Sequence, residues 1–430
     1  MGFVYLQSKP GQYRPVNLPA NLSICQWSES KLSDYDYRCY CRNRNILRDR
    51  LFSSVSESEM TQIKFFRCAI LFLTIAVLLS FQTTGRCYPG FPESSEFGFG
   101  GTIYPEGPYL EQGLDVTGNL RLDWIAVDFP IAKYYPEISS TPDWSRLDLV
   151  IQFASQHQIG ILLSITQPPE WMITPSGPDP SLVSQIINQI ILRYGNMLNA
   201  FELFPSPNTT DGWGNLPDPR AYANLFSTID LLLKQYNSNV TLVTGGLTPL
   251  SPGASLTNQD DLSFLQGLYD TGIAGIMQIV GIDLSNVTGD PLVSPDGTEH
   301  RILRHYEEIR RVMLDNNHAN GKIWITHLKG PSGTIKSSDA IYLDPESQAA
   351  WMDQAYTQMR SQLYIGISIY QGINPRNQDS IQLKDAIIID EMNFHPVYYR
   401  FRTLIANNSQ GSLALKRGKP KTIVLAKTIP

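Results

Sequence analysis

From Gly98 onward, short apolar runs alternate with longer amphipathic segments, and this alternation restricts the chain to few folds. A short apolar run bounded by turn residues predicts a buried strand, and apolar residues at every third or fourth position predict a helix. The predicted strands are Gly98–Tyr104, Leu122–Phe129, Ile159–Ile165, Ala200–Phe204, Thr241–Thr244, Ile276–Asp283, Lys322–Thr326 and Tyr364–Tyr370. Eight such repeats are typical of an α/β fold, the (β/α)8 TIM barrel, so we expect one barrel over residues 97–406.

Helices are predicted between most of these strands. They are Trp144–Gln156, Leu182–Arg193, a helix that begins near Pro219, Asp260–Tyr269, Glu299–Asp315, Gln348–Leu363 and Pro396–Ala406. Asp143 is expected to cap the first of them, and proline is favoured in the first turn of a helix. The basic tail at residues 407–430 is expected to form either an extra strand or a frayed end.

The chain before the barrel has a different character. Residues 1–63 are polar and lack a sustained period, which favours a disordered, cytoplasmic or mis-started segment. Residues 64–84 follow, with an apolar core from Cys68 to Phe81 and basic residues at Lys64 and Arg67. This pattern predicts either a signal anchor with its N-terminus inside or, if translation starts at Met60, a cleaved signal peptide. Both interpretations place the barrel outside the cytoplasm, membrane-anchored or secreted.

Composition narrows the range of partners and cofactors. The net charge is −6, and the basic surplus lies before the barrel, so an acidic barrel is a poor partner for nucleic acid. All cysteines precede the barrel, at Cys25, Cys39, Cys41, Cys68 and Cys87. There is no phosphate-binding loop, no dinucleotide fingerprint and no zinc-protease motif, so we expect no cofactor and no metal. Glycosylation sequons begin at Asn208, Asn239, Asn286 and Asn407.

Six segments, in this order along the chain, resemble the retaining glycoside hydrolases built on (β/α)8 barrels. They are DWSRLDLV from Asp143, PPEW from Pro168, AFELFPSPN from Ala200, TGGL from Thr244, IWITHLKG from Ile323 and AIIIDEMNFHPVYY from Ala386. The resemblance covers most of residues 97–406. It implies a carbohydrate ligand and a site where the strands run into the loops that follow them.

The resemblance also implies which positions carry the catalysis. In that superfamily the fourth strand ends in a segment close to E-x-W-N-E-P-N, whose second Glu is the acid/base; the nucleophile is a Glu in a segment like I-W-x-T-E-x-G. Here the first Glu falls on Glu202, the acid/base on Ser206 and the nucleophile on His327. Retaining hydrolysis requires two carboxylates, so the chain resembles a divergent member that lacks both.

Two other catalytic schemes stay open. Relocated carboxylates could hydrolyse glycosides, and the candidates near the strand ends are Asp128, Glu170, Glu202 and Asp283. Ser206 and His327 could alternatively form a nucleophile and base pair of another hydrolase class, although no G-x-S-x-G elbow surrounds Ser206.

Aromatic and amide side chains at the strand ends are candidates for binding sugar. Trp171, Trp213 and Tyr370 follow or end strands, and each is either a platform for a sugar ring or a packing residue. Asn208 keeps the motif residue and could hold a sugar hydroxyl or cap its loop. The sequence therefore predicts an exported, glycoside-hydrolase-like barrel that binds carbohydrate without hydrolysing it; the alternatives are an active glycosidase and a Ser/His hydrolase.

Overall fold

The computed structural model describes residues 97–236, 239–253, 255–331, 344–377 and 386–409, and the backbone of residues 4–9 and 12–16. The predicted signal or anchor segment at residues 64–84, the cysteines and the tail beyond residue 409 lie outside the described residues. Within the described part, no helix has both the length and the apolar character needed to cross a membrane.

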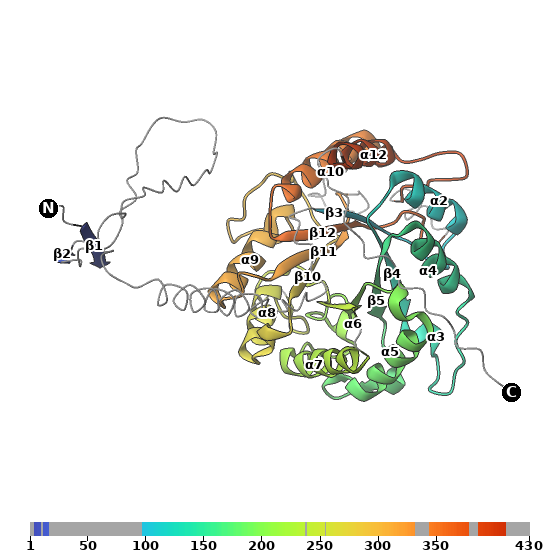
Figure 1. Ribbon diagram of the computed structural model, residues 1–430, viewed down its shortest axis with the longest axis horizontal. Coiled ribbons are helices and arrows are strands. Elements are labelled where there is room, and N and C mark those ends of the chain that lie inside the picture. Colours follow the sequence, from blue (N-terminus) through green and yellow to red (C-terminus); the bar gives the residue numbers. More distant parts are fainter. Residues whose placement is uncertain are drawn as a thin grey trace, which may run out of the picture. The chain divides into compact units, whose positions relative to one another are not determined.

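The chain divides into two compact units, residues 1–85 and 86–430. In the first unit, strand β1 (Val4–Lys9) pairs antiparallel with β2 (Gln12–Val16). The second unit holds the barrel (Figure 1).

Eight parallel strands close into the predicted TIM barrel, in the order β10-β11-β12-β3-β4-β5-β8-β9. They are β3 (Gly98–Thr102), β4 (Trp124–Pro130), β5 (Gly160–Thr166), β8 (Ala200–Leu203), β9 (Thr241–Thr244), β10 (Ile279–Leu284), β11 (Lys322–Leu328) and β12 (Ile365–Tyr370). Each predicted strand is present. The sixth begins three residues later than expected, because the turn that follows the short helix η3 (Ile273–Gly275) occupies the intervening residues.

Helices form a layer outside the strands (Figure 1). They are α2 (Leu110–Leu120), α3 (Ile131–Tyr134), α4 (Ser145–His157), α5 (Pro180–Tyr194), α6 (Thr210–Trp213), α7 (Pro219–Gln235), α8 (Asp261–Asp270), α9 (Tyr306–Asp315), α10 (Pro345–Arg360) and α12 (Pro396–Ser409). Helix α2 was not predicted. The helix predicted from Glu299 is shorter than expected: α9 begins at Tyr306, after the single turn η4 (Leu303–His305). The remaining short pieces are η1 (Glu170–Met172), η2 (Gly195–Met197), β6 (Ile173–Thr174) and β7 (Gly177–Pro178).

Three of the long helices begin with the same dipeptide, Asp-Pro. Asp179, Asp218 and Asp344 are the N-caps of α5, α7 and α10, and each carboxylate accepts hydrogen bonds from two backbone N–H groups of the first turn. Proline follows each of them, in a position where its missing N–H has no intrahelical partner. The local sequence therefore fixes where these helices start.

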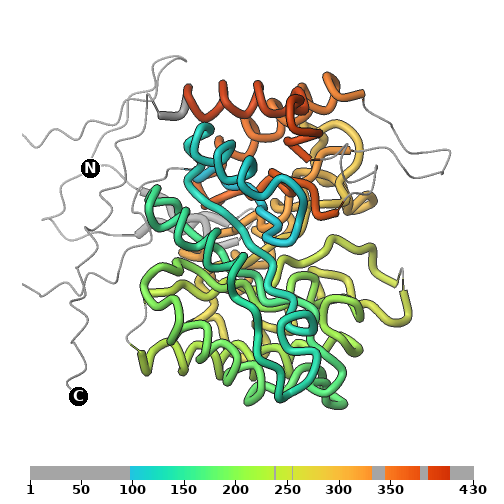
Figure 2. The backbone as a smooth tube through the Cα atoms, turned by 90° about the vertical axis from the view of Figure 1, so that its right-hand side faces the viewer, coloured from blue at the N-terminus to red at the C-terminus, as the bar shows by residue number. Residues whose placement is uncertain are grey.

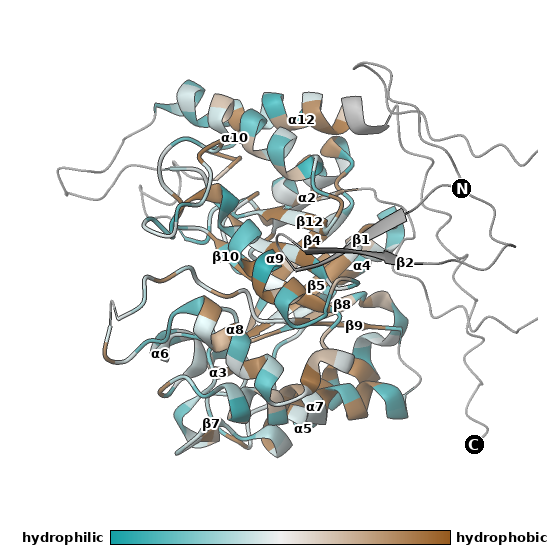
Figure 3. Cartoon of the chain, turned by 90° about the vertical axis from the view of Figure 1, so that its left-hand side faces the viewer, coloured by the Kyte–Doolittle hydropathy of each residue, from teal (hydrophilic) through white to brown (hydrophobic). Residues whose placement is uncertain are grey.

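Helices from the two ends of the barrel sequence lie together. In Figure 2 the first barrel helix, α2, lies beside the last, α12, and the two helices are in contact. Apolar residues concentrate on the central strands, while the helices alternate hydrophobic and hydrophilic residues along their length (Figure 3). This pattern is that of amphipathic helices covering a buried sheet.

The barrel interior has an apolar end and a polar end. Trp324 and Trp124 meet edge to face inside the barrel, toward the amino-terminal ends of the strands, with ring centroids 5.0 Å apart. Glycines on neighbouring strands make room for these indoles: a Cβ at Gly160 would lie 2.9 Å from the Trp124 ring, and one at Gly366 2.6 Å from Trp324. Polar side chains collect at the carboxyl ends of the strands, where a TIM barrel carries its site.

Candidate functional site

The centre of the barrel mouth is His327, close to the end of β11. Trp324 faces the barrel interior, so in a regular strand Thr326 would also face inward and His327 would face the helices. The pairing of β11 with β10 shifts at Thr326, which places His327 opposite Asp283. Such a β-bulge redirects a side chain, and bulges are common beside functional sites. His327 is 8% exposed, and its Nδ1 lies 3.2 Å from the Thr326 hydroxyl.

Neighbouring carboxylates shift the pKa of His327. Burial by itself lowers the pKa of the imidazole, but its carboxylate neighbours outweigh burial and raise that pKa above the ordinary value; they are Glu202, Asp283 and Asp128. An opposite charge nearby favours the charged form of a titratable group. These carboxylates therefore favour the protonated imidazole of His327, the residue at the predicted nucleophile position.

Glu202, on β8, lies beneath the mouth and is fully buried. The Ser164 hydroxyl donates to its Oε2 at 2.5 Å, and the Gly246 N–H donates to its Oε1 at 2.8 Å. Burial raises the pKa of this carboxyl, and His327 and the hydrogen-bond donors offset part of that rise. A side chain without exposed surface cannot contact a ligand, so Glu202 acts here on its neighbours.

Ser206, at the position where the resemblance predicts the acid/base, lies in a strained loop after β8. Both Phe204 and Ser206 have left-handed backbone conformations, with φ of 52° and 60°. Side chains other than glycine rarely adopt this region, and such strain is often found at functional sites. The Ser206 hydroxyl lies 2.7 Å from that of Thr248 and 3.5 Å from Asp283 Oδ2. Within the described chain, no hydrogen bond connects Ser206 with His327.

Asn208 fixes this loop to the next one. Its Nδ2 donates to the carbonyls of Thr248 and Gln259, at 2.9 and 3.0 Å, and its Oδ1 accepts from the Thr248 N–H at 3.0 Å. The side chain is fully buried. Asn208 therefore has its amide engaged by the protein rather than available to a sugar hydroxyl or a glycan.

Asp128, at the end of β4, forms an ion pair with Arg376 from the loop after β12. The Arg376 guanidinium also lies over the Tyr104 ring, 4.9 Å from its centroid. Burial, followed by the nearby Asp128 carboxylate, raises the pKa of Tyr104 to about 12. The Arg376 side chain is 48% exposed and that of Asp128 15%, so this pair borders solvent at the mouth.

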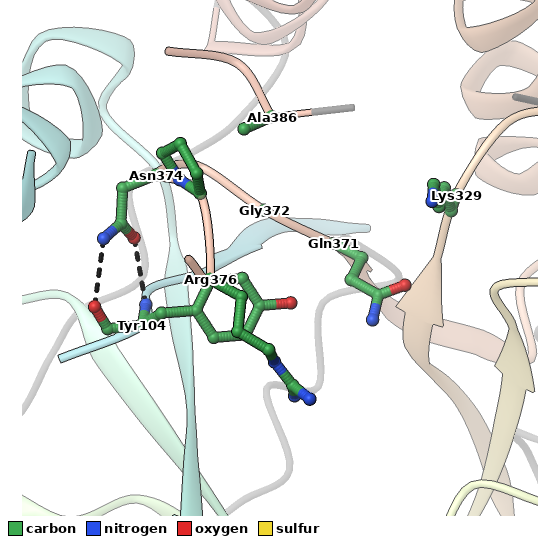
Figure 4. A pocket seen from close by; sticks show the side chains of 8 residues that line it. Tyr104, Lys329, Gln371, Gly372, Asn374, Arg376 and Ala386 are labelled. Atoms are coloured by element: carbon green, nitrogen blue, oxygen red, sulfur yellow. Dashed lines mark hydrogen bonds between the residues drawn. The ribbon is translucent and has the colours of Figure 1, made fainter. Parts of the chain in front are cut away.

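A pocket of about 120 Å³ opens beside this pair (Figure 4). Asn374 supports it by bonding the backbone N–H and carbonyl of Tyr104, at 2.9 and 3.0 Å. The lining residues are Tyr104, Lys329, Gln371, Gly372, Asn374, Pro375, Arg376 and Ala386. Its walls thus offer two basic groups, Lys329 and Arg376, the Gln371 amide and the Tyr104 hydroxyl, which suit a polar ligand.

The remaining predicted residues occupy different environments. Trp213 and Tyr370 are each 1% exposed and pack inside the protein, which leaves no ring face for a sugar. Trp171 is half-buried, and its indole N–H donates to the Tyr135 carbonyl at 3.1 Å. Glu170 is exposed, in η1. The structure therefore brings Asp128, Glu202, Asp283 and His327 together, with Ser206 at their edge.

Sequence reasoning missed Arg376, Tyr104 and Thr248. Each of them follows a barrel strand: Tyr104 comes after β3, Thr248 after β9 and Arg376 after β12. The rule that sites lie at the carboxyl ends of strands could have found them, because it applies to every strand and not only to those with acids.

Comparisons with known proteins bear on the fold. No family model matches the sequence, and no curated protein matches it. Among solved structures, a family 39 glycoside hydrolase from Bacteroides cellulosilyticus WH2 aligns with a TM-score of 0.54 and 14% identity, over 72% of this chain and 64% of that one. A glucosidase from Croceicoccus marinus aligns with a TM-score of 0.53 and 11% identity, over 73% and 70%.

A third similar structure is a conserved exported protein from Bacteroides fragilis, with a TM-score of 0.52 and 9% identity over 72% of this chain and 78% of that one. The barrel has the fold of glycoside hydrolases. The chain spans less than two thirds of the length of the family 39 enzyme. At these identities the likeness concerns the fold, and the chemistry must be argued from the site itself.

Proposed function

We propose that this barrel binds carbohydrate at its mouth and does not hydrolyse glycosides. One observation carries the proposal: the position of the nucleophile holds His327, whose carboxylate neighbours raise its pKa and favour a cation. Glycoside hydrolysis passes through a transition state that resembles an oxocarbenium ion, and a cation beside it is destabilising. The acid/base position holds Ser206, whose hydroxyl does not ionise near neutral pH.

The acidic residues at the barrel mouth give little support to a relocated pair of catalytic carboxylates. Glu202 is fully buried, and Asp128 is paired with Arg376. The groups around the pocket suit recognition: Arg376 and Gln371 line it together with Tyr104, whose ring lies beneath the Arg376 guanidinium. Trp171, elsewhere among the strand-end loops, is half-buried. Planar polar groups beside an aromatic face are the usual means by which proteins hold sugars.

The test is reducing-sugar release by the purified protein over a broad panel of polysaccharides and oligosaccharides, together with glycan-array binding. We expect binding without turnover above a mock preparation. Arg376→Gln should weaken the binding, whereas Arg220→Gln, at an exposed position on α7, should leave it unchanged. Sustained turnover by the wild type would overturn the proposal.

A second candidate is an active glycosidase that uses Asp128 and Asp283. The positions of these acids favour it, because both are near enough to His327 to raise its pKa and neither is fully buried. If turnover is found, each of the variants Asp128→Asn and Asp283→Asn should abolish it, because retaining hydrolysis needs both carboxylates. A Ser206/His327 hydrolase has less support, since no hydrogen bond connects the two, and Ser206→Ala would test it by loss of ester hydrolysis.

We propose further that the barrel is exported, with residues 64–84 as a membrane anchor or a cleaved signal peptide. The support is the apolar run from Cys68 to Phe81 with its basic flank. Expression in a eukaryotic host followed by enzymatic deglycosylation would test it. Export predicts glycans at the exposed Asn239 and Asn286 but none at the buried Asn208. An unglycosylated, cytosolic product would contradict it.

A further inference from the structure

A cluster of four titratable side chains lies outside the mouth, where α8 meets α9 and the segment before it. Asp261 is the first residue of α8, His300 lies in the segment before η4, His305 ends η4, and Glu308 lies on α9. Their exposures are 0% for Asp261 and His305, 5% for Glu308 and 6% for His300. Such a concentration of buried titratable groups requires a compensating interaction.

Distances within the cluster are short. His305 Nε2 lies 2.6 Å from Asp261 Oδ2, and His305 Nδ1 lies 2.9 Å from Glu308 Oε2. His300 Nδ1 lies 3.7 Å from the same Glu308 oxygen. One ring nitrogen of each histidine and one carboxylate oxygen of Glu308 all lie within 4.8 Å of one another.

Those same three atoms are unsatisfied. His300 Nδ1, His305 Nδ1 and Glu308 Oε2 are buried without a hydrogen-bond partner. The 2.9 Å contact between His305 and Glu308 is close enough for an ion pair but lacks hydrogen-bond geometry. An unsatisfied buried polar atom costs about 1–3 kcal/mol, so three atoms that converge on one point indicate a missing partner.

The geometry points to a divalent metal site, with His300 Nδ1, His305 Nδ1 and Glu308 Oε2 as ligands and Zn²⁺ as the preferred ion. Imidazole nitrogens and a carboxylate oxygen are the usual zinc ligands in proteins. Bonds of about 2.1 Å in a tetrahedral shell place neighbouring ligands about 3.4 Å apart. The observed separations of 2.9 and 3.7 Å fall on either side of that spacing.

Asp261 supplies the support that a metal-binding histidine requires. Its Oδ2 faces His305 Nε2, which places the proton of a neutral imidazole on Nε2 and leaves the Nδ1 lone pair directed at the site. The other Asp261 oxygen accepts the Leu250 N–H at 3.0 Å, so the carboxylate is itself held in place. The ion would tie the segment around His300 to α9 and would act on stability rather than on the chemistry of the mouth.

A bound proton offers a rival account of part of this cluster. A protonated His305 could bridge Asp261 and Glu308, and although burial opposes the charge, these carboxylates raise the His305 pKa to about 9. That account leaves His300 Nδ1 without a partner. His300 is therefore the residue that distinguishes a metal from a proton.

The experiment uses the full chain without a histidine tag, stripped with a chelator and dialysed. Zinc added to this protein should bind at about one ion per chain and raise the melting temperature, because a ligand specific for the folded state stabilises it. His300→Gln keeps His305, Asp261 and Glu308, yet it should weaken zinc binding at least about tenfold and remove the thermal shift. His318→Gln is the matched control, since His318 is half-buried against Tyr269 and lies outside the cluster.

X-ray absorption at the zinc edge of the wild-type protein tests the ligand set without any variant, and should show two imidazole ligands. Absence of zinc binding by the wild type would overturn the inference. Equal zinc uptake by wild type and His300→Gln, or a zinc spectrum without imidazole ligands, would overturn it as well.

Discussion

At the scale of single residues, the mouth is a balance of charges around His327. Glu202, Asp283 and Asp128 raise the pKa of the His327 imidazole against the opposing effect of burial. The same imidazole lowers the pKa of Glu202, which burial raises. Each group thus favours the charged form of the other, against the effect of burial, as expected for titratable groups that share a low-dielectric site.

His327→Gln should destabilise the fold by about 3 kcal/mol at pH 5.5, the amount typical of removing one member of a buried charge pair. The folded-state pKa of His327 is raised, so its stabilisation is complete below the unfolded value of about 6.5 and is lost as the pH rises through the folded value. The difference between wild type and variant in urea unfolding should therefore shrink at alkaline pH.

The control for this substitution is His157→Gln, at an exposed position near the end of α4. Its effect should stay within about 0.5 kcal/mol at every pH. A difference between wild type and His327→Gln that does not change with pH would show that the pKa of His327 is the same in the folded and unfolded states.

Asn208→Ala should cost about 3 kcal/mol of unfolding free energy. The change leaves the partly buried N–H of Thr248 and the carbonyls of Thr248 and Gln259 without their partner. Asn224→Ala is the matched control, because Asn224 is exposed on α7. Equal chemical-denaturation midpoints for the two variants would refute the role given to Asn208.

At the scale of elements, β8 and β9 approach each other closely where they enter the mouth. A Cβ at Gly245 would lie 2.0 Å from the Phe204 carbonyl oxygen and 2.5 Å from that of Leu203. Both obstacles are backbone atoms that cannot rotate away. The glycines of the TGGL segment therefore determine how near Ser206 and Glu202 come to the next strand.

Gly245→Ala should destabilise the barrel by about 3 kcal/mol, because the strands must separate to admit a methyl group. Gly275→Ala provides the comparison: no atom lies within 4 Å of its Cβ position, so its effect should stay within about 0.5 kcal/mol. Thermal unfolding of both variants checks this. Equal melting temperatures would show that the strands accommodate the added methyl group without separating.

At the scale of the whole molecule, the two ends of the barrel have different roles: the amino-terminal ends of the strands stabilise the fold, and the carboxyl ends carry the proposed binding site. The interior at the amino-terminal end is filled by Trp124 and Trp324 against small and aliphatic side chains. The interior at the carboxyl end carries the polar mouth. Because TIM-barrel sites lie at the carboxyl ends of strands, substitutions at the amino-terminal end should act on stability alone.

Trp324→Ala should reduce the unfolding free energy by about 4 kcal/mol through the cavity it creates, and should leave the glycan affinity of the folded fraction unchanged. Trp171→Ala should weaken glycan binding and should cost less unfolding free energy than Trp324→Ala, since Trp171 is only half-buried. Parallel denaturation and binding measurements separate the two effects. A loss of affinity in Trp324→Ala at full folding would contradict this division.

Much of the architecture could be predicted from the sequence. Most barrel strands are predominantly apolar, because a parallel strand is buried on both faces. The Asp-Pro pairs at Asp179, Asp218 and Asp344 begin helices through bonds to their own first turn. Helix α2 was missed, and its glycines at Gly113 and Gly118 weaken the local helical pattern.

The sequence by itself determined the barrel and the absence of carboxylates at positions 206 and 327, because strand periodicity and residue identity are local properties. Tertiary structure decided what lies around those positions: the bulge that turns His327 toward Asp283, the pairing of Asp128 with Arg376, and the burial of Trp213 and Tyr370. It also decided that Asp261 meets His305 across 44 residues of chain. Such contacts depend on which strand ends and loops meet in space, and no local pattern records that.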